Sequence, residues 1–117
     1  MAKSLAHTKY IKTHISYVHK RGSDPLYIAI VNRRGSCYGH AILLKKALDK
    51  ADVPNCIIYT NGKAHYWNYV YEKGAWRHYD SNPGVHPIYI ANDKAKLATP
   101  QIGGRTFNKS ECPEEAQ

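Results

Sequence analysis

Helical spacing dominates the first half of the chain. Residues 4–20 carry apolar side chains at the 3.6-residue spacing of one helix face, with Lys and His between them. Asp24 followed by Pro25 is the N-cap and first-turn chemistry of a second helix start. We therefore expect a long first helix, and a short second helix that reaches about Asn32.

A third helix is predicted from Cys37 to about Ala51. Ser36 stands before it as an N-cap. Between Ala41 and Leu48 the apolar residues form one stripe, and charged residues occupy the opposite face. This pattern is typical of a central helix that buries one side against a sheet.

Beyond Pro54 the hydrophobic period changes from 3.6 to 2, which indicates strands. Turn chemistry at Asn61-Gly62 and around Gly74 favours hairpins. The expected strands are 55–60, 64–70, 75–80 and 85–90. Helices followed by strands predict a single α+β domain over residues 1–117, an antiparallel sheet packed on the central helix. Its core is expected over about 25–90, with a flexible tail at 110–117.

Composition supports one globular domain. The chain has 117 residues, of which 43% are hydrophobic and 22% charged, so wholesale disorder is excluded. No apolar run approaches the ~20 residues of a membrane span. The first residues lack a signal-peptide pattern. The chain is thus expected to be cytosolic, or a domain cut from a longer secreted protein, and its oligomeric state is open.

Charge bears on the possible partners. Seventeen Lys and Arg against nine Asp and Glu give a net charge of +8, which attracts acidic partners. The basic residues are scattered in runs no longer than two, Lys94 and Lys96 among them. Because nucleic-acid surfaces usually gather their charge on one face, a solvated basic surface is favoured over a nucleic-acid-binding protein. The latter stays as an alternative.

The three cysteines are expected to play different parts. They are Cys37, Cys56 and Cys112, with no CxxC pair and no zinc-ligand spacing, so neither a disulfide framework nor a metal or other cofactor is expected. Cys56 lies in a predicted strand and is interpreted as a buried, inert thiol. Cys112 lies in the polar tail and is given no role. An odd number leaves at least one free thiol.

Cys37 is the candidate nucleophile. It stands in the first turn of the central helix, where unpaired N–H groups and the positive end of the helix dipole favour a thiolate and can hold an oxyanion. The alternative is a small buried thiol of the core. A thiolate nucleophile needs a base, and the base needs an orienting group. His65, which starts one strand, and Asp80, which ends the next, are the candidates.

A specific hairpin register would bring this base and its orienting group together. A four-residue loop over 71–74 pairs Val70 with Ala75 and sets His65 directly opposite Asp80. A three-residue loop would turn Asp80 to the other face. Considered alone, His65 could equally be a half-exposed strand residue, and Asp80 could be a turn residue. A metal site that also uses His78 is a distant alternative.

Four blocks of sequence resemble the transglutaminase-like superfamily, closest to its small bacterial members. That family has Gly-x-Cys at the start of its core helix, an Ala-Gly-(Ile/Val)-Pro after it, a His-x-Trp strand and a Gly-x-Trp-x-x-x-Asp strand. The matching blocks are Gly35-Ser36-Cys37-Tyr38-Gly39-His40-Ala41, Ala51-Asp52-Val53-Pro54, His65-Tyr66-Trp67-Asn68 and Gly74-Ala75-Trp76-Arg77-His78-Tyr79-Asp80.

The resemblance implies a papain-like cysteine chemistry on an α+β fold. By position, Cys37 matches the family nucleophile, His65 the base and Asp80 the orienting carboxylate. The implied reaction is acyl transfer on a protein or peptide amide through a thioester. Hydrolysis by a peptidase, amidase or deamidase is favoured over cross-linking. A non-catalytic protein- or peptide-binding domain of the same fold is the alternative.

Aromatic residues are the candidates for a substrate groove. Ten of the 13 rings are tyrosines, which suit half-wet surfaces but are also common in strands. Tyr38, Tyr66 and Trp67 are predicted to bind substrate, with core packing as the alternative for the tryptophan. The family's side-chain oxyanion donor lies upstream of its nucleophile. No residue matches it closely, and Tyr27 is the candidate considered.

Overall fold

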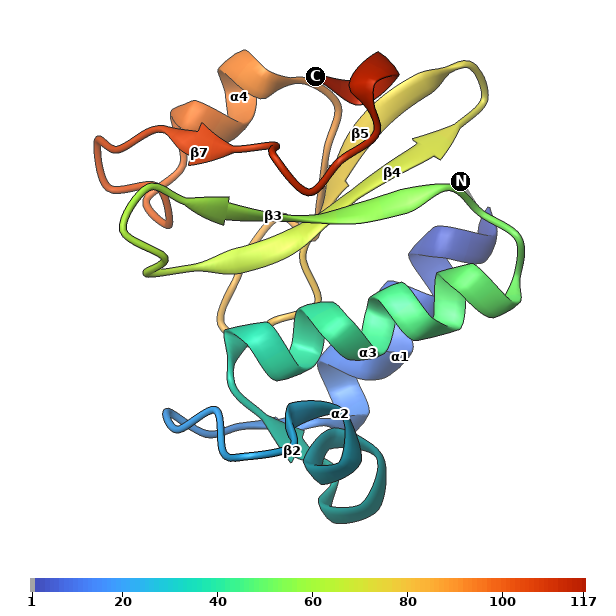
Figure 1. The fold of residues 1–117 in the computed structure, drawn as a ribbon, viewed down its shortest axis with the longest axis vertical. Coiled ribbons are helices and arrows are strands. Elements are labelled where there is room, and N and C mark those ends of the chain that lie inside the picture. The colour runs from blue at the N-terminus through green and yellow to red at the C-terminus, as the bar shows by residue number, and fades with distance from the viewer. Residues whose placement is uncertain (1) are drawn as a thin grey trace.

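A five-stranded antiparallel sheet is the centre of the molecule in the computed structural model, which describes residues 2–117 (Figure 1). The strand order is β6-β5-β4-β3-β7. The predicted strand 55–60 is confirmed, and the second and third strands lie within two residues of their predicted bounds. The bounds are β3 Asn55–Thr60, β4 Tyr66–Glu72, β5 Ala75–Tyr79, β6 Tyr89–Ile90 and β7 Phe107–Asn108.

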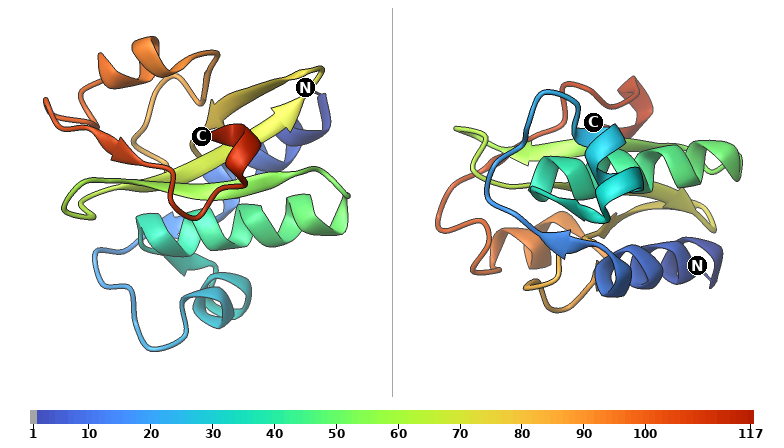
Figure 2. Two further views of the ribbon diagram at one scale, coloured as in Figure 1. Left: turned by 45° about the horizontal axis from the view of Figure 1, so that its top comes forward. Right: turned by 90° about the horizontal axis from the view of Figure 1, so that it is seen from below.

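Two helices cover one face of this sheet. They are α1 (Ala2–His14) and α3 (Cys37–Lys50), which pack on each other and on β4 (Figures 1 and 2). Apolar side chains from both helices and from β4 and β5 share one core cluster. The predicted stripe on the central helix is confirmed, since Ala41, Leu44 and Leu48 are fully buried.

The first helix ends earlier than its hydrophobic spacing predicted. The chain leaves α1 and forms β1 (Ser16–Tyr17), which pairs in parallel with β2 (Arg34–Gly35). Main-chain pairing thus overrode the helix predicted over 15–20, with Val18 N donating to Gly35 O at 3.0 Å. The consequence is that β1 lies beside the residues that lead into α3.

Both predicted helix starts are confirmed. Asp24 Oδ1 accepts from Tyr27 N at 3.1 Å at the start of α2 (Pro25–Tyr27), which continues as a π-helical turn, η1 (Ile28–Asn32). Ser36 Oγ accepts from Gly39 N at 3.2 Å at the start of α3. These caps satisfy donors that helix starts otherwise leave unpaired.

The predicted hairpin register was wrong by two residues. The turn between β4 and β5 contains only Lys73 and Gly74, both at positive φ (49° and 81°), so Glu72 pairs with Ala75. Two successive left-handed residues form the compact turn that matches the twist of a hairpin. Because the shift is even, every side chain keeps its predicted face. His65 and Asp80 are diagonal rather than direct neighbours.

The C-terminal region, for which the sequence predicted a flexible tail at 110–117, packs on the other face of the sheet. It contains α4 (Asp93–Leu97), β7 and a 3₁₀ turn, η2 (Glu114–Ala116) (Figure 2). Ile102, Cys112 and Ala116 are buried there against β3 and β4. The hydrophobic core therefore extends on both sides of residues 25–90, because α1 also contributes to it.

A disulfide joins Cys56 of β3 to Cys112 of the tail, with 5.1 Å between their Cα atoms. This corrects two predictions, an inert thiol at Cys56 and a cysteine without a role at Cys112. The spacing of the two residues carried no signal, because the tail reaches β3 only after crossing the sheet. The free thiol that an odd count requires is Cys37.

The last predicted strand is shorter than expected. Only Tyr89 and Ile90 pair with β5, whereas residues 85–88 form a bend that contains Pro87. Proline lacks the N–H that a ladder position requires. Within residues 2–117, no helix has both the length and the apolar character needed to span a membrane.

The disulfide should contribute strongly to stability, because it closes a loop with a sequence separation of 56. The loop-entropy relation gives about 4 kcal/mol, which corresponds to a fall in Tm of about 10–20 °C when both cysteines are replaced. Calorimetry of Cys56→Ser/Cys112→Ser against Cys37→Ser measures it. A double variant as stable as the single one would contradict the bond.

Candidate active site

The start of α3 presents the one free thiol. Cys37 is half-buried at the first helical position, directly after Ser36, which is buried and caps the helix. The first amides of a helix have no intrahelical acceptor, and the cap takes only that of Gly39. Amides left free at a helix start are donors of the kind that can hold a carbonyl oxygen.

His65 lies between this thiol and a buried carboxylate. Its Nε2–H donates to Asp80 Oδ2 at 2.6 Å, and the Asp80 side chain is only 2% exposed. The Cys37 side chain also acts on this ring, as one of the groups that raise the pKa of His65. Since Nε2 is engaged by the carboxylate, Nδ1 is the ring nitrogen left for another partner. The buried carboxylate of Asp80 and the side chain of Cys37 thus both act on one imidazole, although 43 residues separate them in the sequence.

Asp80 is held from both of its oxygens. Asn82 donates to Oδ1 twice, from its backbone N at 2.9 Å and from Nδ2 at 2.7 Å, while Oδ2 receives His65. Burial alone would raise the pKa of this carboxyl, but the hydrogen bond and charge of His65, the charge of Lys96 and the Asn82 backbone hydrogen bond lower it. Asp80 is therefore an ionised and oriented acceptor.

The same contacts decide the protonation of His65. Burial alone would lower the pKa of the imidazole, but the hydrogen bonds and charges of Asp80 and Cys37 outweigh it and raise the pKa to about 9. At neutral pH the ring is therefore protonated beside the thiol. A protonated imidazole is the partner that a cysteine nucleophile uses.

Tyr17 lies near the thiol, whereas the sequence pointed to Tyr27 as the candidate side-chain oxyanion donor. Strand pairing sets Tyr17 beside Gly35, two residues before Cys37. Burial raises the pKa of the Tyr17 hydroxyl, and the negative charge of Cys37 raises it further, which indicates that the two groups are close. Tyr27 is instead exposed on α2. Because the pairing of β1 could not be read from the sequence, no signal there pointed to Tyr17.

A hollow of about 450 Å³ opens beside His65. Tyr17 lies on one side of it, and the loop that follows Asp80 lies on the other. Its lining residues are Tyr17, His65, Asn82, Gly84, Val85 and Gln101. This hollow is adjacent to the His65 ring.

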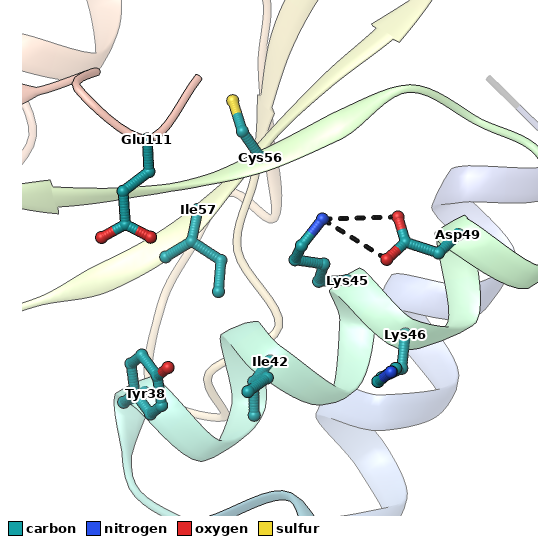
Figure 3. A pocket seen from close by; sticks show the side chains of 8 residues that line it. All are labelled: Tyr38, Ile42, Lys45, Lys46, Asp49, Cys56, Ile57 and Glu111. Atoms are coloured by element: carbon teal, nitrogen blue, oxygen red, sulfur yellow. Dashed lines mark hydrogen bonds and ion pairs between the residues drawn. The ribbon is translucent and has the colours of Figure 1, made fainter. Parts of the chain in front are cut away.

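A second, smaller cavity of about 210 Å³ lies between α3 and β3. Figure 3 shows Tyr38 and Ile42 on α3 below Ile57 of β3, with Glu111 of the tail above and Lys45 paired with Asp49. Arg21 stacks on the Tyr38 ring at 3.7 Å. Of the three predicted substrate-binding residues, only Tyr38 lines one of the cavities.

Trp67 and Tyr66 are part of the core. Trp67 is fully buried, so the prediction that it contacts substrate was wrong. Its ring packs between His65, at 5.7 Å between centroids, and Phe107, at 5.5 Å. Tyr66 is 8% exposed and packs edge-on against Tyr38. Trp67 packs against the ring of His65 inside the core, so other residues must make any contact with a substrate.

His78 is a structural residue rather than a metal ligand. Trp67 Nε1–H donates to His78 Nδ1 at 2.9 Å, and His78 Nε2–H donates to Asp93 Oδ1 at 2.8 Å. Both ring nitrogens are therefore taken, and His78 is not free to bind a metal together with His65 and Asp80. Burial lowers the pKa of His78 to about 4 in spite of Asp93, so this ring stays neutral.

The sequence interpretation missed Lys96. We counted it among the scattered surface cations, but its side chain is 1% exposed and lies 3.7 Å from Asp80 Oδ2. It belongs to a five-residue helix that is too short to show a hydrophobic period. Only the three-dimensional structure brings it to the carboxylate.

The comparisons with known proteins bear on the fold. A scan of protein-family models finds no match, and neither does a search of curated proteins. Among solved structures, the chain is similar to a proposed cysteine protease from Cytophaga hutchinsonii, with a TM-score of 0.59 and 22% identity over 75% of this chain. It is also similar to a TGase, with a TM-score of 0.57 and 18% identity over 72%.

These similarities confirm the predicted transglutaminase-like α+β fold. At 22% and 18% identity they establish the architecture and not the reaction. The matches span 34% and 26% of the two larger proteins. Activity must therefore be argued from the residues of this chain.

Replacing Asp80 should lower the pKa of His65 sharply. Asp80→Asn removes the charge that stabilises the imidazolium and leaves the burial that opposes it, so a pKa of about 9 should fall below the ordinary value of about 6.5. NMR titration of the ring nitrogens measures this. An unchanged titration would show that Asp80 does not act on the ring.

The free energy of unfolding should depend on pH, because the pKa of His65 is raised in the folded state. The folded-state pKa of His65, about 9, lies above its ordinary value, so its protonation stabilises the fold fully below about pH 6.5. This contribution is lost as the pH rises through about 9. Urea unfolding of the wild type and His65→Gln across this range should show the wild type's advantage shrinking; an advantage that grows with pH would contradict the assignment.

Proposed function

We propose that this chain catalyses cysteine-dependent acyl transfer on amide bonds of a protein or peptide, with water as the acceptor. The observation that supports it is the His65 ring, which bonds the buried Asp80 carboxylate through Nε2 and lies near enough to Cys37 for that group to raise the pKa of the ring. A buried carboxylate, an oriented imidazole and a free thiol at a helix start form the arrangement that nucleophilic catalysis requires.

The first half-reaction forms a thioester. The Cys37 thiolate attacks the amide carbon, the C–S bond forms, and the carbonyl electron pair moves to the oxygen, which the helix-start amides hold. Protonated His65 then gives its proton to the amide nitrogen as the C–N bond breaks, and the amine leaves. Asp80 keeps the ring in the tautomer that faces the sulfur.

The second half-reaction returns the enzyme to its starting state. Neutral His65 takes a proton from water, the hydroxide attacks the thioester carbon, and the Cys37 sulfur leaves as a thiolate beside the imidazolium. The product is a carboxylic acid. A primary amine in place of water would instead give a new amide, and this alternative outcome is cross-linking.

The labelling of Cys37 tests the pair directly. We expect iodoacetamide to alkylate Cys37 at pH 6–7 much faster than an ordinary free thiol, because a thiolate is held by the imidazolium. His65→Ala should remove this advantage. The exposed His14→Ala is the matched control and should retain it. Slow labelling of the wild type, unaffected by His65→Ala, would favour the non-catalytic binding domain.

Peptide hydrolysis tests the reaction itself. Cys37→Ser and His65→Ala should each abolish turnover, and Asp80→Asn should reduce kcat roughly 10⁴-fold, the size seen when an orienting carboxylate is lost. Incorporation of ¹⁸O from labelled water identifies hydrolysis, and incorporation of a tagged amine identifies cross-linking. Turnover that persists in Cys37→Ser would overturn the proposed nucleophile.

Tyr17 is proposed as the side-chain donor to the oxyanion, because it lines the hollow beside His65 and its hydroxyl is close enough to feel the Cys37 charge. Tyr17→Phe should lower kcat by roughly 10- to 1000-fold, with little change in KM, since the bond would form only in the transition state. Tyr10→Phe, an exposed tyrosine on α1, is the control. An equal loss in both variants would remove Tyr17 from the mechanism.

A further inference from the structure

The side chain of Lys96 is only 1% exposed, and the proposed mechanism gives it no part. Lys96 is the one buried residue of α4, a short helix capped by Asn92. Taking an ammonium group out of water is unfavourable unless a partner compensates for it. The contacts of Lys96 should therefore indicate what its charge does.

The partner of Lys96 is the carboxylate oxygen that also holds His65. Lys96 Nζ lies 3.7 Å from Asp80 Oδ2, and His65 Nε2 lies 2.6 Å from the same atom. Two cations thus share one oxygen, Lys96 from the interior and His65 from the side of the thiol. Because the other oxygen of Asp80 is saturated by Asn82, this carboxylate has little freedom to rotate.

Trp67 packs against both cations. Lys96 Nζ lies 4.6 Å from the centre of the Trp67 ring, and the His65 ring stacks on Trp67 at 5.7 Å between centroids. The indole is itself fixed by its hydrogen bond to His78. A buried aromatic face stabilises an ammonium and shields the ion pair from water.

Three other titratable groups lie around this ion pair. Lys12 adds a third positive charge near Asp80, the charge of Lys96 acts on neutral His78, and Cys37 acts on His65. Asp80 is thus the anion that balances the charge of Lys96. Burial lowers the pKa of Lys96 and attraction to Asp80 opposes this, so the ion pair decides whether the amine stays charged.

We propose that Lys96 is a positioning residue of the site: its ammonium restrains Asp80 from behind, takes up part of the carboxylate's charge, and so keeps His65 from becoming too basic to release its proton. The inference rests on the proposed function, because it assigns this role in the same acyl transfer. The benefit is a proton donor whose acidity lies nearer the working pH.

Lys96→Met tests the inference, since methionine keeps most of the length and removes the charge. Without Lys96 the full charge of Asp80 acts on His65, so the NMR titration midpoint of the ring should rise by about one unit or more. The alkaline limb of kcat/KM should move with it, and kcat should fall more than KM rises. Lys94→Met, an exposed lysine on the same helix, should change neither. Lys96→Arg should restore the midpoint.

A folded Lys96→Met protein with the wild-type midpoint would overturn the proposal, and so would a folded Lys96→Arg protein with the midpoint of the methionine variant. Should the methionine variant not fold, ¹⁵N NMR of the wild-type Lys96 Nζ decides. An ammonium at pH 7 whose signal follows the titration of His65 supports the role, and a neutral amine or an indifferent signal refutes it. Neither NMR measurement needs a substrate. A wild type without activity would therefore contradict the proposed reaction but not the effect of Lys96 on His65.

Discussion

The hydrogen bond between His65 and Asp80 is the interaction on which the rest of the site depends. It orients the imidazole, and together with the charge of Asp80 and the influence of Cys37 it outweighs a burial that would otherwise keep the ring neutral. A charged pair of this kind survives in the interior only when the remaining lone pairs are satisfied. Asn82 and Lys96 do this for the carboxylate, so the site is a buried ionic network with one open side at the thiol.

The two faces of the sheet contribute different parts of this network. The helical face supplies the thiol at the start of α3, with β1 beside it through the parallel pairing. The opposite face supplies the support: Trp67 packs behind His65, Lys96 reaches Asp80 from α4, and a disulfide attaches the tail that covers them. In this arrangement the C-terminal region completes the site.

Local sequence was enough for the helix starts, for the central helix and for the pairing of His65 with Asp80. These depend on caps, on hydrophobic period and on face parity, which an error of two residues in register does not change. What could not be predicted depends on contacts between distant segments. The disulfide, the pairing that sets Tyr17 beside the thiol, and the burial of Lys96 all require knowing how the tail and β1 return to the sheet.

The most direct test of the account is to trap the acyl group on the protein. Rapid mixing with an activated peptide ester, followed by mass spectrometry and peptide mapping, should find one acyl adduct on Cys37 that hydroxylamine removes, as expected for a thioester. The adduct should not form in His65→Ala. An adduct confined to lysines, or one that forms on Cys37 equally well without the histidine, would contradict the proposed relay of thiol, imidazole and carboxylate.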